Sequence, residues 1–202
     1  MSDMLTIDRI GTAILIMDYQ NDIVALLPEE RQKPQLQRVA RVLDAARQAG
    51  LPVIYVKNRF RDGYPEVSSR NKVFSGVKQR GLLRESTPGV DISVEVAPEL
   101  GEVIVTKCRS SAFHATELET ILQVKGVNKL VLFGIRTSGC VLSTVRQAAD
   151  MDYDITVISD CCGDTDEETH QVLMQKIFPQ QTTVVTTQEF ISLIENEPAD
   201  KQ

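Results

Sequence analysis

The chain has 202 residues, of which 42% are hydrophobic and 25% are charged, and its formal net charge at pH 7 is −6. A chain of this length usually forms one core, so we expect a single domain over residues 1–202. The acidic balance argues against a nucleic-acid partner, because such binding needs a basic face to neutralise phosphates. No apolar run approaches the roughly 20 residues that span a bilayer, and the first residues lack the charge and apolar pattern of a signal peptide. We therefore expect a cytoplasmic protein with no membrane partner.

The four cysteines of the chain do not form the pattern of a disulfide framework. No Cys-x-x-Cys pair is present, so neither a zinc site nor a dithiol redox motif is indicated. We expect free thiols. The adjacent pair Cys161 and Cys162 is interpreted as buried and structural rather than as a redox switch.

In the first half of the chain, short apolar runs alternate with helical patterns. The run Thr12–Met17 is typical of a strand buried on both faces, which belongs to a parallel sheet. The pattern then predicts, in order, a helix over 34–49 closed by Gly50, a strand over 53–56, a long functional loop over 57–90 and a strand over 102–106.

The second half continues the same alternation. The pattern first predicts a helix over 117–124 stopped by Gly126, a strand over 129–133, a turn over 134–139 and a helix over 140–149. A strand over 155–158 follows, and then a capping box at 165–168 opens a helix to 178. The last elements are a strand over 183–185 and a capping box at 186–189 before a final helix. Strands that alternate with helices predict a doubly wound, mostly parallel six-stranded sheet with helices on both faces.

Asp18, Lys107 and Cys140 each follow a predicted strand. Ligands of such sheets bind beyond the carboxyl ends of the strands, so the three side chains are expected to converge there. A carboxylate, an ammonium and a thiol together make an activated nucleophile. Because Cys140 lies near a predicted helix N-terminus and an ammonium, we expect its thiolate to be favoured.

Three ordered motifs carry a family resemblance. They are Leu15–Asp22, Val105–Lys107 followed by Ser111–Phe113, and Gly134–Val141. Together they resemble the isochorismatase-like cysteine hydrolases over nearly the whole chain. The resemblance implies an α/β sheet fold and a catalytic triad of Asp18, Lys107 and Cys140. It also implies a cis peptide bond between Ile135 and Arg136, and an oxyanion hole formed by the backbone N–H groups of Arg136 and Cys140.

The chain departs from the nicotinamidase branch of that family. Nicotinamidases carry an Asp-x-His metal motif after the second strand, where this sequence reads Tyr55–Arg59 without it. The two histidines, His114 and His170, have no acidic cluster at ligand spacing. We therefore expect no catalytic metal and no cofactor.

Candidate substrate contacts flank the three reactive residues. Tyr19, Gln20 and Phe113 are candidates for the pocket wall, although Phe113 fits the core equally well. Arg59 in the long loop is a candidate contact for a small anionic or ureido substrate, and the alternative is an exposed loop or subunit contact. The guanidinium of Arg136 either binds a substrate carboxylate or points to solvent.

These observations predict a metal-independent cysteine hydrolase that cleaves the C–N bond of a small amide, carbamoyl or ureido substrate through a thioester. The first alternative is isochorismatase-type hydrolysis of a vinyl ether with Asp18 and Lys107. The second is a thiol redox or binding protein. The resemblance also implies a homo-oligomer, a dimer or a tetramer, in which a partner buries the apolar residues Leu82, Leu83 and Val90.

Overall fold

A computed structural model describes residues 9–196. This part of the chain forms a six-stranded sheet in the order β3-β2-β1-β4-β5-β6, and every neighbouring pair is parallel. The strands are Thr12–Met17 (β1), Val53–Asn58 (β2), Val103–Lys107 (β3), Lys129–Gly134 (β4), Asp154–Ile158 (β5) and Thr183–Val185 (β6). The predicted fold class is confirmed, and the strand ends differ from the prediction by no more than two residues, the larger difference being at the end of β2.

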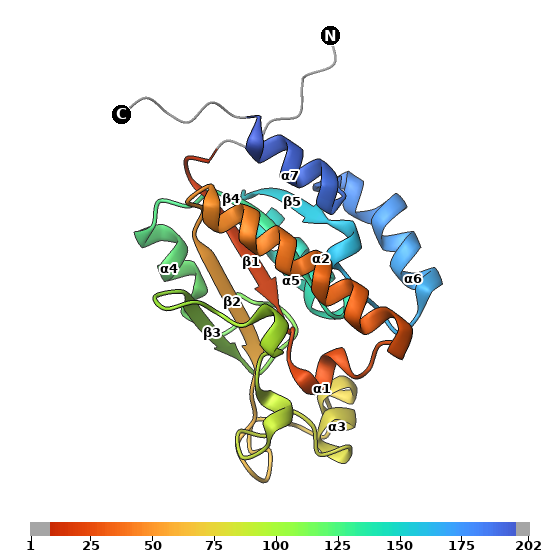
Figure 1. Ribbon diagram of the computed structural model, residues 1–202. Coiled ribbons are helices and arrows are strands. Elements are labelled where there is room, and N and C mark those ends of the chain that lie inside the picture. Colours follow the sequence, from red (N-terminus) through yellow and green to blue (C-terminus); the bar gives the residue numbers. More distant parts are fainter. Residues whose placement is uncertain (1–8, 197–202) are drawn as a thin grey trace.

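Helices cover both faces of the sheet. They are Asn21–Val24 (α1), Glu29–Gln48 (α2), Lys72–Gln79 (α3), Leu118–Val124 (α4), Leu142–Asp150 (α5), Glu167–Val172 (α6) and Thr187–Glu195 (α7). Figure 1 shows α2 in front of the sheet with α7 beside it, and α5 behind the sheet. All six residues of β1 are buried, because this strand has neighbours on both edges and helices on both faces. None of the described helices is long and apolar enough to cross a membrane.

The sheet has a topological switch point beside β1. The chain leaves β1 toward β2 on one side, and it returns later to place β4 on the other side. Connections that depart in opposite directions leave a crevice at the carboxyl ends of the two central strands. Met17, the last residue of β1, pairs with Val56 and Gly134 on its two neighbours. A ligand site is therefore expected at this end of the sheet.

The prediction for the first long helix was wrong at its start. The helix begins at Glu29, and Pro34 lies inside it. Proline is most often found in the first turn of a helix, because it has no N–H to donate, and the sequence analysis therefore placed the start at Pro34. The predicted end, at residue 49, lies one residue beyond the observed end, and Gly50 follows with a φ of 73° as expected for the residue that closes the helix.

The loop predicted over 57–90 contains the helix α3. The side chain of Asn71 caps it by accepting a hydrogen bond from the N–H of Phe74 at 3.2 Å. The helix buries Phe74 and Val77, which are three residues apart and therefore share one face. A helix of this length is too short for its periodicity to stand out among the surrounding glycine, proline and arginine residues.

The capping box predicted at Thr165 is also wrong. The cap of α6 is Asp166, whose side chain accepts a hydrogen bond from the N–H of Thr169. By contrast, the predicted box at Thr186 and Glu189 is confirmed in both directions. Aspartate caps a helix as well as threonine does, so the one-residue shift has little energetic cost.

Candidate functional site

The ends of four strands place polar side chains close together. Asp18 follows β1, Asn58 ends β2, Lys107 ends β3, and Cys140 lies in the turn Thr137–Val141 between β4 and α5. A cavity of about 260 Å³ opens beside Asp18, Asn58 and Cys140. It is lined by Asp18, Ile23, Leu26, Asn58, Val73, Phe74, Val77, Arg80, Leu82, Leu83, Ser110, Ile135, Arg136, Ser138, Gly139, Cys140 and Ser143. A concave, mostly apolar cavity with a few convergent polar groups is the usual form of a small-molecule site.

Lys107 is a buried cation with a complete set of hydrogen bonds. Its side chain is fully removed from solvent, and its Nζ donates to Oδ2 of Asp18 at 2.7 Å. The same nitrogen donates to the backbone oxygens of Arg109 at 3.2 Å and Ser110 at 3.1 Å. An ammonium has three N–H bonds, and here each has an acceptor. Lys107 thereby fixes the position of the Asp18 carboxylate and balances its charge.

The two oxygens of Asp18 have different surroundings. Oδ2 accepts from Lys107 and also from Nδ2 of Asn58 at 3.1 Å. Oδ1 is buried and has no hydrogen-bond partner among the described residues. The residue itself adopts a φ of 59°, in the left-handed region that non-glycine residues rarely use and that is enriched at functional sites. The carboxylate therefore keeps one buried oxygen available as a proton acceptor.

Cys140 is a buried thiol beside this carboxylate. Only 4% of the residue is exposed, and Sγ lies 3.6 Å from the backbone oxygen of Arg136. Burial, followed by the negative charge of Asp18, raises the pKa of the thiol well above its ordinary value of 9.0, and Lys107 opposes only part of this shift. The expectation of a favoured thiolate is therefore wrong. Cys140 is a neutral thiol at pH 7.

The pKa of Asp18 is also raised above its ordinary value of 3.8. Burial is the main cause, because it penalises the charged carboxylate, while Lys107 works in the opposite direction. A carboxylate with a raised pKa is a stronger base than an exposed one. Asp18 is thus suited to take a proton from a neutral neighbour.

The turn that carries Cys140 begins with the cis peptide bond between Ile135 and Arg136, which was predicted from the family resemblance. Most of the following amides already have acceptors within the protein. The N–H of Thr137 donates to Gly163 O at 2.8 Å, and that of Gly139 donates to Arg136 O at 3.0 Å. For the N–H of Arg136, the described residues provide no acceptor. This amide remains available to an oxygen of a bound molecule.

Two of the predicted substrate contacts, Tyr19 and Gln20, lie outside the residues that line the cavity. The hydroxyl of Tyr19 donates to the backbone oxygen of Cys161. Gln20 donates to the backbone oxygen of Asn58 at 2.7 Å and accepts from its N–H at 2.8 Å. These contacts give both side chains a role in the frame of the site, which corrects the expectation that they wall the pocket.

Arg59 and Phe113 also lie outside the cavity lining. Arg59 forms an ion pair with Glu85 at 3.4 Å on the surface. Phe113 is buried against Tyr153, with ring centroids 5.7 Å apart. Their placement favours the alternatives stated for them above, a surface loop and a core position. Arg136 does line the cavity, and its Nε lies 3.4 Å from Oδ1 of Asp164.

Most of the apolar residues that line the cavity were not predicted from the sequence. Phe74 and Val77 of α3 contribute to it, together with Ile23 and Leu26 from the segment after β1. Figure 1 shows α3 beyond the arrowheads of β1 and β2. The available signal was the cap residue Asn71 with apolar residues following it, which marks a short helix inside the long loop.

Other expectations concern thiols, metals and a partner chain. The four cysteines are free, and Cys161 and Cys162 are buried. Within residues 9–196, no group of three or more histidine, cysteine or acidic side chains is arranged to hold a metal ion. Leu83 and Val90 are buried by the chain itself, so they do not provide the apolar surface that was expected to meet a partner. The homo-oligomer stays a prediction.

The chain resembles known proteins over most of its length. The isochorismatase domain family matches residues 12–189. A probable inactive nicotinamidase of Arabidopsis thaliana is 32% identical, over 79% of this chain and 84% of that protein. A ureidoacrylate amidohydrolase of Rhizobium rhizogenes is 28% identical, over 94% of this chain and 82% of that protein. A cysteine hydrolase from Pseudomonas syringae pv. phaseolicola superposes with a TM-score of 0.84 at 26% identity, covering 96% of this chain and 99% of that one. The chain is therefore a member of the isochorismatase family.

Proposed function

We propose that this protein is a cysteine hydrolase that cleaves the C–N bond of a small amide, carbamoyl or ureido compound through a thioester. One observation carries the proposal. Asp18 keeps a buried oxygen without a partner, beside a neutral Cys140 thiol and on the wall of one cavity. The similarity to an amidohydrolase and to a cysteine hydrolase supports the same reaction class.

In the first half of the reaction, Asp18 takes the proton of Cys140 while Sγ attacks the carbonyl carbon. The carbonyl electron pair moves onto oxygen, and the backbone N–H groups of Arg136 and Cys140 stabilise the oxyanion. Collapse of this intermediate breaks the C–N bond, and Asp18 returns its proton to the leaving nitrogen. Lys107 holds the carboxylate in position throughout, through the 2.7 Å ion pair.

In the second half, water replaces the amine. Asp18 takes a proton from the water, the oxygen attacks the thioester, and the C–S bond breaks. The proton then returns to sulfur, which restores the neutral thiol. Every proton transfer of this cycle uses the Asp18 carboxylate. Because Asp18 and Cys140 are buried, the cycle suits a site with little exposure to solvent.

The test measures ammonia released from a panel of small carboxamides, N-carbamoyl amino acids and ureido acids. Cys140→Ala is expected to abolish the release, and Asp18→Asn is expected to lower it by about 10²–10⁴. Cys108→Ala is the matched control, because this partly buried thiol lies outside the cavity lining. Undiminished release from Cys140→Ala would refute the assignment.

The same variants separate the two rival functions. Hydrolysis of the vinyl ether of isochorismate releases pyruvate, and it would survive Cys140→Ala but not Asp18→Asn. A redox role would appear as a reversible disulfide that involves Cys161 or Cys162, detected by mass spectrometry of the native protein. An acyl group on Cys140 alone supports the proposed hydrolysis.

A further inference from the structure

The turn between β4 and α5 carries Cys140 and the two amides of the proposed oxyanion site, and residues outside the turn help to hold it. It contains a π-helical turn over Thr137–Val141, a form that is rare and often found at functional sites. Its conformation decides where the amides of Arg136 and Cys140 point. Contacts from outside the turn therefore bear on the direction of these amides.

One buried carboxylate binds the turn at two points. Asp164 is 3% exposed, and its Oδ2 accepts from the N–H of Ser138 at 2.7 Å and from the hydroxyl of Ser138 at 2.6 Å. Its Oδ1 lies 3.4 Å from Nε of Arg136 and accepts from the N–H of Thr165 at 2.8 Å. A single side chain thus binds the backbone and hydroxyl of Ser138 and the guanidinium of Arg136, two residues that lie on either side of Thr137.

The electrostatics of Asp164 agree with this geometry. Burial alone would oppose ionisation, but the hydrogen bonds from Ser138 and the charge of Arg136 outweigh it, so that the pKa lies below its ordinary value of 3.8. Asp164 is therefore a carboxylate at neutral pH. Both of its oxygens accept hydrogen bonds, an arrangement that favours the ionised form because a carboxylate has only acceptors.

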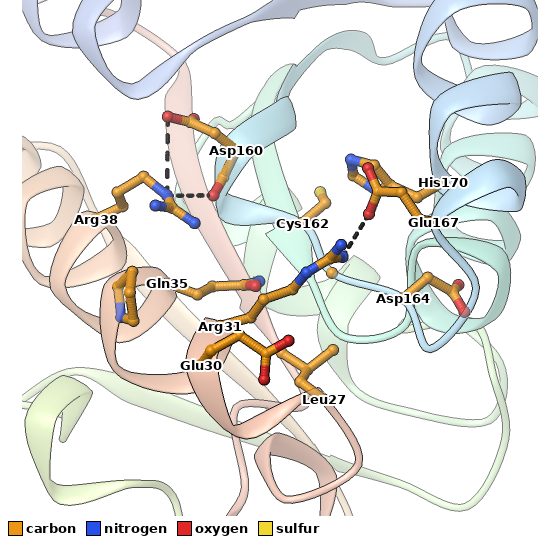
Figure 2. A pocket seen from close by; sticks show the side chains of 12 residues that line it. Leu27, Glu30, Arg31, Gln35, Arg38, Asp160, Cys162, Asp164, Glu167 and His170 are labelled. Carbon is orange, nitrogen blue, oxygen red and sulfur yellow. Dashed lines mark hydrogen bonds and ion pairs between the residues drawn. The ribbon is translucent and has the colours of Figure 1, made fainter.

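Residues that line a second cavity also contact the turn. This cavity lies away from the proposed nucleophile. This cavity, of about 280 Å³, is lined by Asp164 and His170, among others, and Figure 2 shows both side chains on its wall. Nδ1 of His170 is 2.8 Å from the hydroxyl of Thr137. Ser138 lines the first cavity, and the residue that holds it lines the second.

We propose that Asp164 is a positioning residue for the oxyanion site. Through Ser138 and Arg136 it holds the turn so that the amides of Arg136 and Cys140 point at the developing oxyanion. The inference rests on the proposed function, because it assigns those two amides to the oxyanion. Asp164 contacts neither the substrate nor the thiol in this role.

The test compares two reactions of Cys140 that differ in the need for an oxyanion site. With p-nitrophenyl acetate, Sγ bonds to the carbonyl carbon, the carbonyl pair moves to oxygen and returns, p-nitrophenolate leaves, and Asp18 takes the thiol proton. With iodoacetamide, the thiol first loses its proton to the buffer, Sγ of the thiolate then displaces iodide from a methylene carbon, and no oxyanion forms. Mass spectrometry of the Cys140 peptide gives both rates for this one thiol.

Asp164→Asn and Asp164→Ala are expected to slow acylation about 10-fold or more, because loss of one oxyanion donor typically costs about 10²–10³ in rate. Alkylation is expected to change less than about threefold. Asp166→Ala is the matched control, since Asp166 caps α6 in the same stretch without touching the turn, and neither rate should change. Thermal unfolding of each variant shows whether it is folded.

Equal slowing of both reactions, or unchanged acylation in a folded Asp164→Asn variant, would overturn the proposal. Asp164→Asn is close in shape to the native residue, so the comparison remains available if Asp164→Ala does not fold. Neither rate requires the natural substrate. Suppose that no amide of the panel is hydrolysed, but the Asp164 variants still slow acylation more than alkylation. That result would count against the proposed function and would leave the positioning role standing.

Discussion

Lys107 and Asp18 form an ion pair of 2.7 Å from which solvent is excluded, although the two residues are 89 positions apart in the chain. The pair joins the end of β3 to the end of β1 across β2. A charge left alone in such a place is strongly unfavourable, while removal of both charges together has a much smaller effect. This difference allows the role of the pair in stability to be measured.

Replacement of Lys107 by Met is expected to lower the free energy of unfolding by roughly 3–5 kcal/mol, because the Asp18 carboxylate is left buried without its cation. The double variant Lys107→Met with Asp18→Asn should recover most of that loss. Urea denaturation followed by circular dichroism measures both. Equal losses in the single and double variants would show that the charges are not coupled in this way.

The dependence of kcat/KM on pH should show an acid limb whose midpoint lies above 3.8. Asp18 must be ionised to take a proton, and its pKa is raised by burial, so activity falls as the pH drops through that raised value. The pKa of Cys140 lies well above 9.0, so the thiol keeps its proton up to that pH. Activity that rises steadily toward pH 9 would indicate instead that the thiolate is the form that reacts.

Asp18→Asn is expected to change the rate of hydrolysis and the rate of Cys140 alkylation in opposite directions. Hydrolysis should drop by about 10²–10⁴, the usual contribution of a general acid or base. Alkylation of Cys140 by iodoacetamide at pH 8 should become faster, because the negative charge of Asp18 is one cause of the raised thiol pKa. Cys108 in the same sample is the internal standard. Slower alkylation of Cys140 would contradict the stated cause of its pKa shift.

Gly134→Ala is expected to lower activity at least about 10-fold and stability by about 1–3 kcal/mol. A Cβ at this position would lie 2.7 Å from the backbone oxygen of Met17 and 3.1 Å from Sγ of Cys140, so β4 or the sulfur must move. Gly76→Ala is the control, because a Cβ there has no atom within 4 Å and the position is helical. Ammonia release and thermal unfolding report the two effects.

The sequence predicted the features that depend on local pattern. Buried strands are short and apolar, so all six were found, and polar residues at or after the strand ends lie at the ligand edge of the sheet for topological reasons. This rule led to Asp18, Lys107 and Cys140. The same pattern cannot give a pKa, which depends on burial and on charges that come from distant parts of the chain.

The main errors of the sequence-based predictions concern the directions of side chains and the presence of short helices. Asp18 and Tyr19 are adjacent, yet one lines the cavity and the other donates to Cys161 O. The pattern gives no direction beyond the strand end, where Asp18 already has a positive φ. Similarly, α3 is too short for a convincing period, so the residues that it adds to the cavity were not recognised.

The position of α3 has a consequence for how this protein can diversify. The reactive groups sit on strand ends and on the turn before α5, whereas much of the apolar wall comes from α3 and its flanks within the single β2–β3 connection. Under the proposed function, the reacting groups and the groups that select the substrate are thus encoded largely in separate stretches of chain. A transplant of residues 72–83 from a relative would alter which molecules are accepted while the bond-breaking apparatus stays the same.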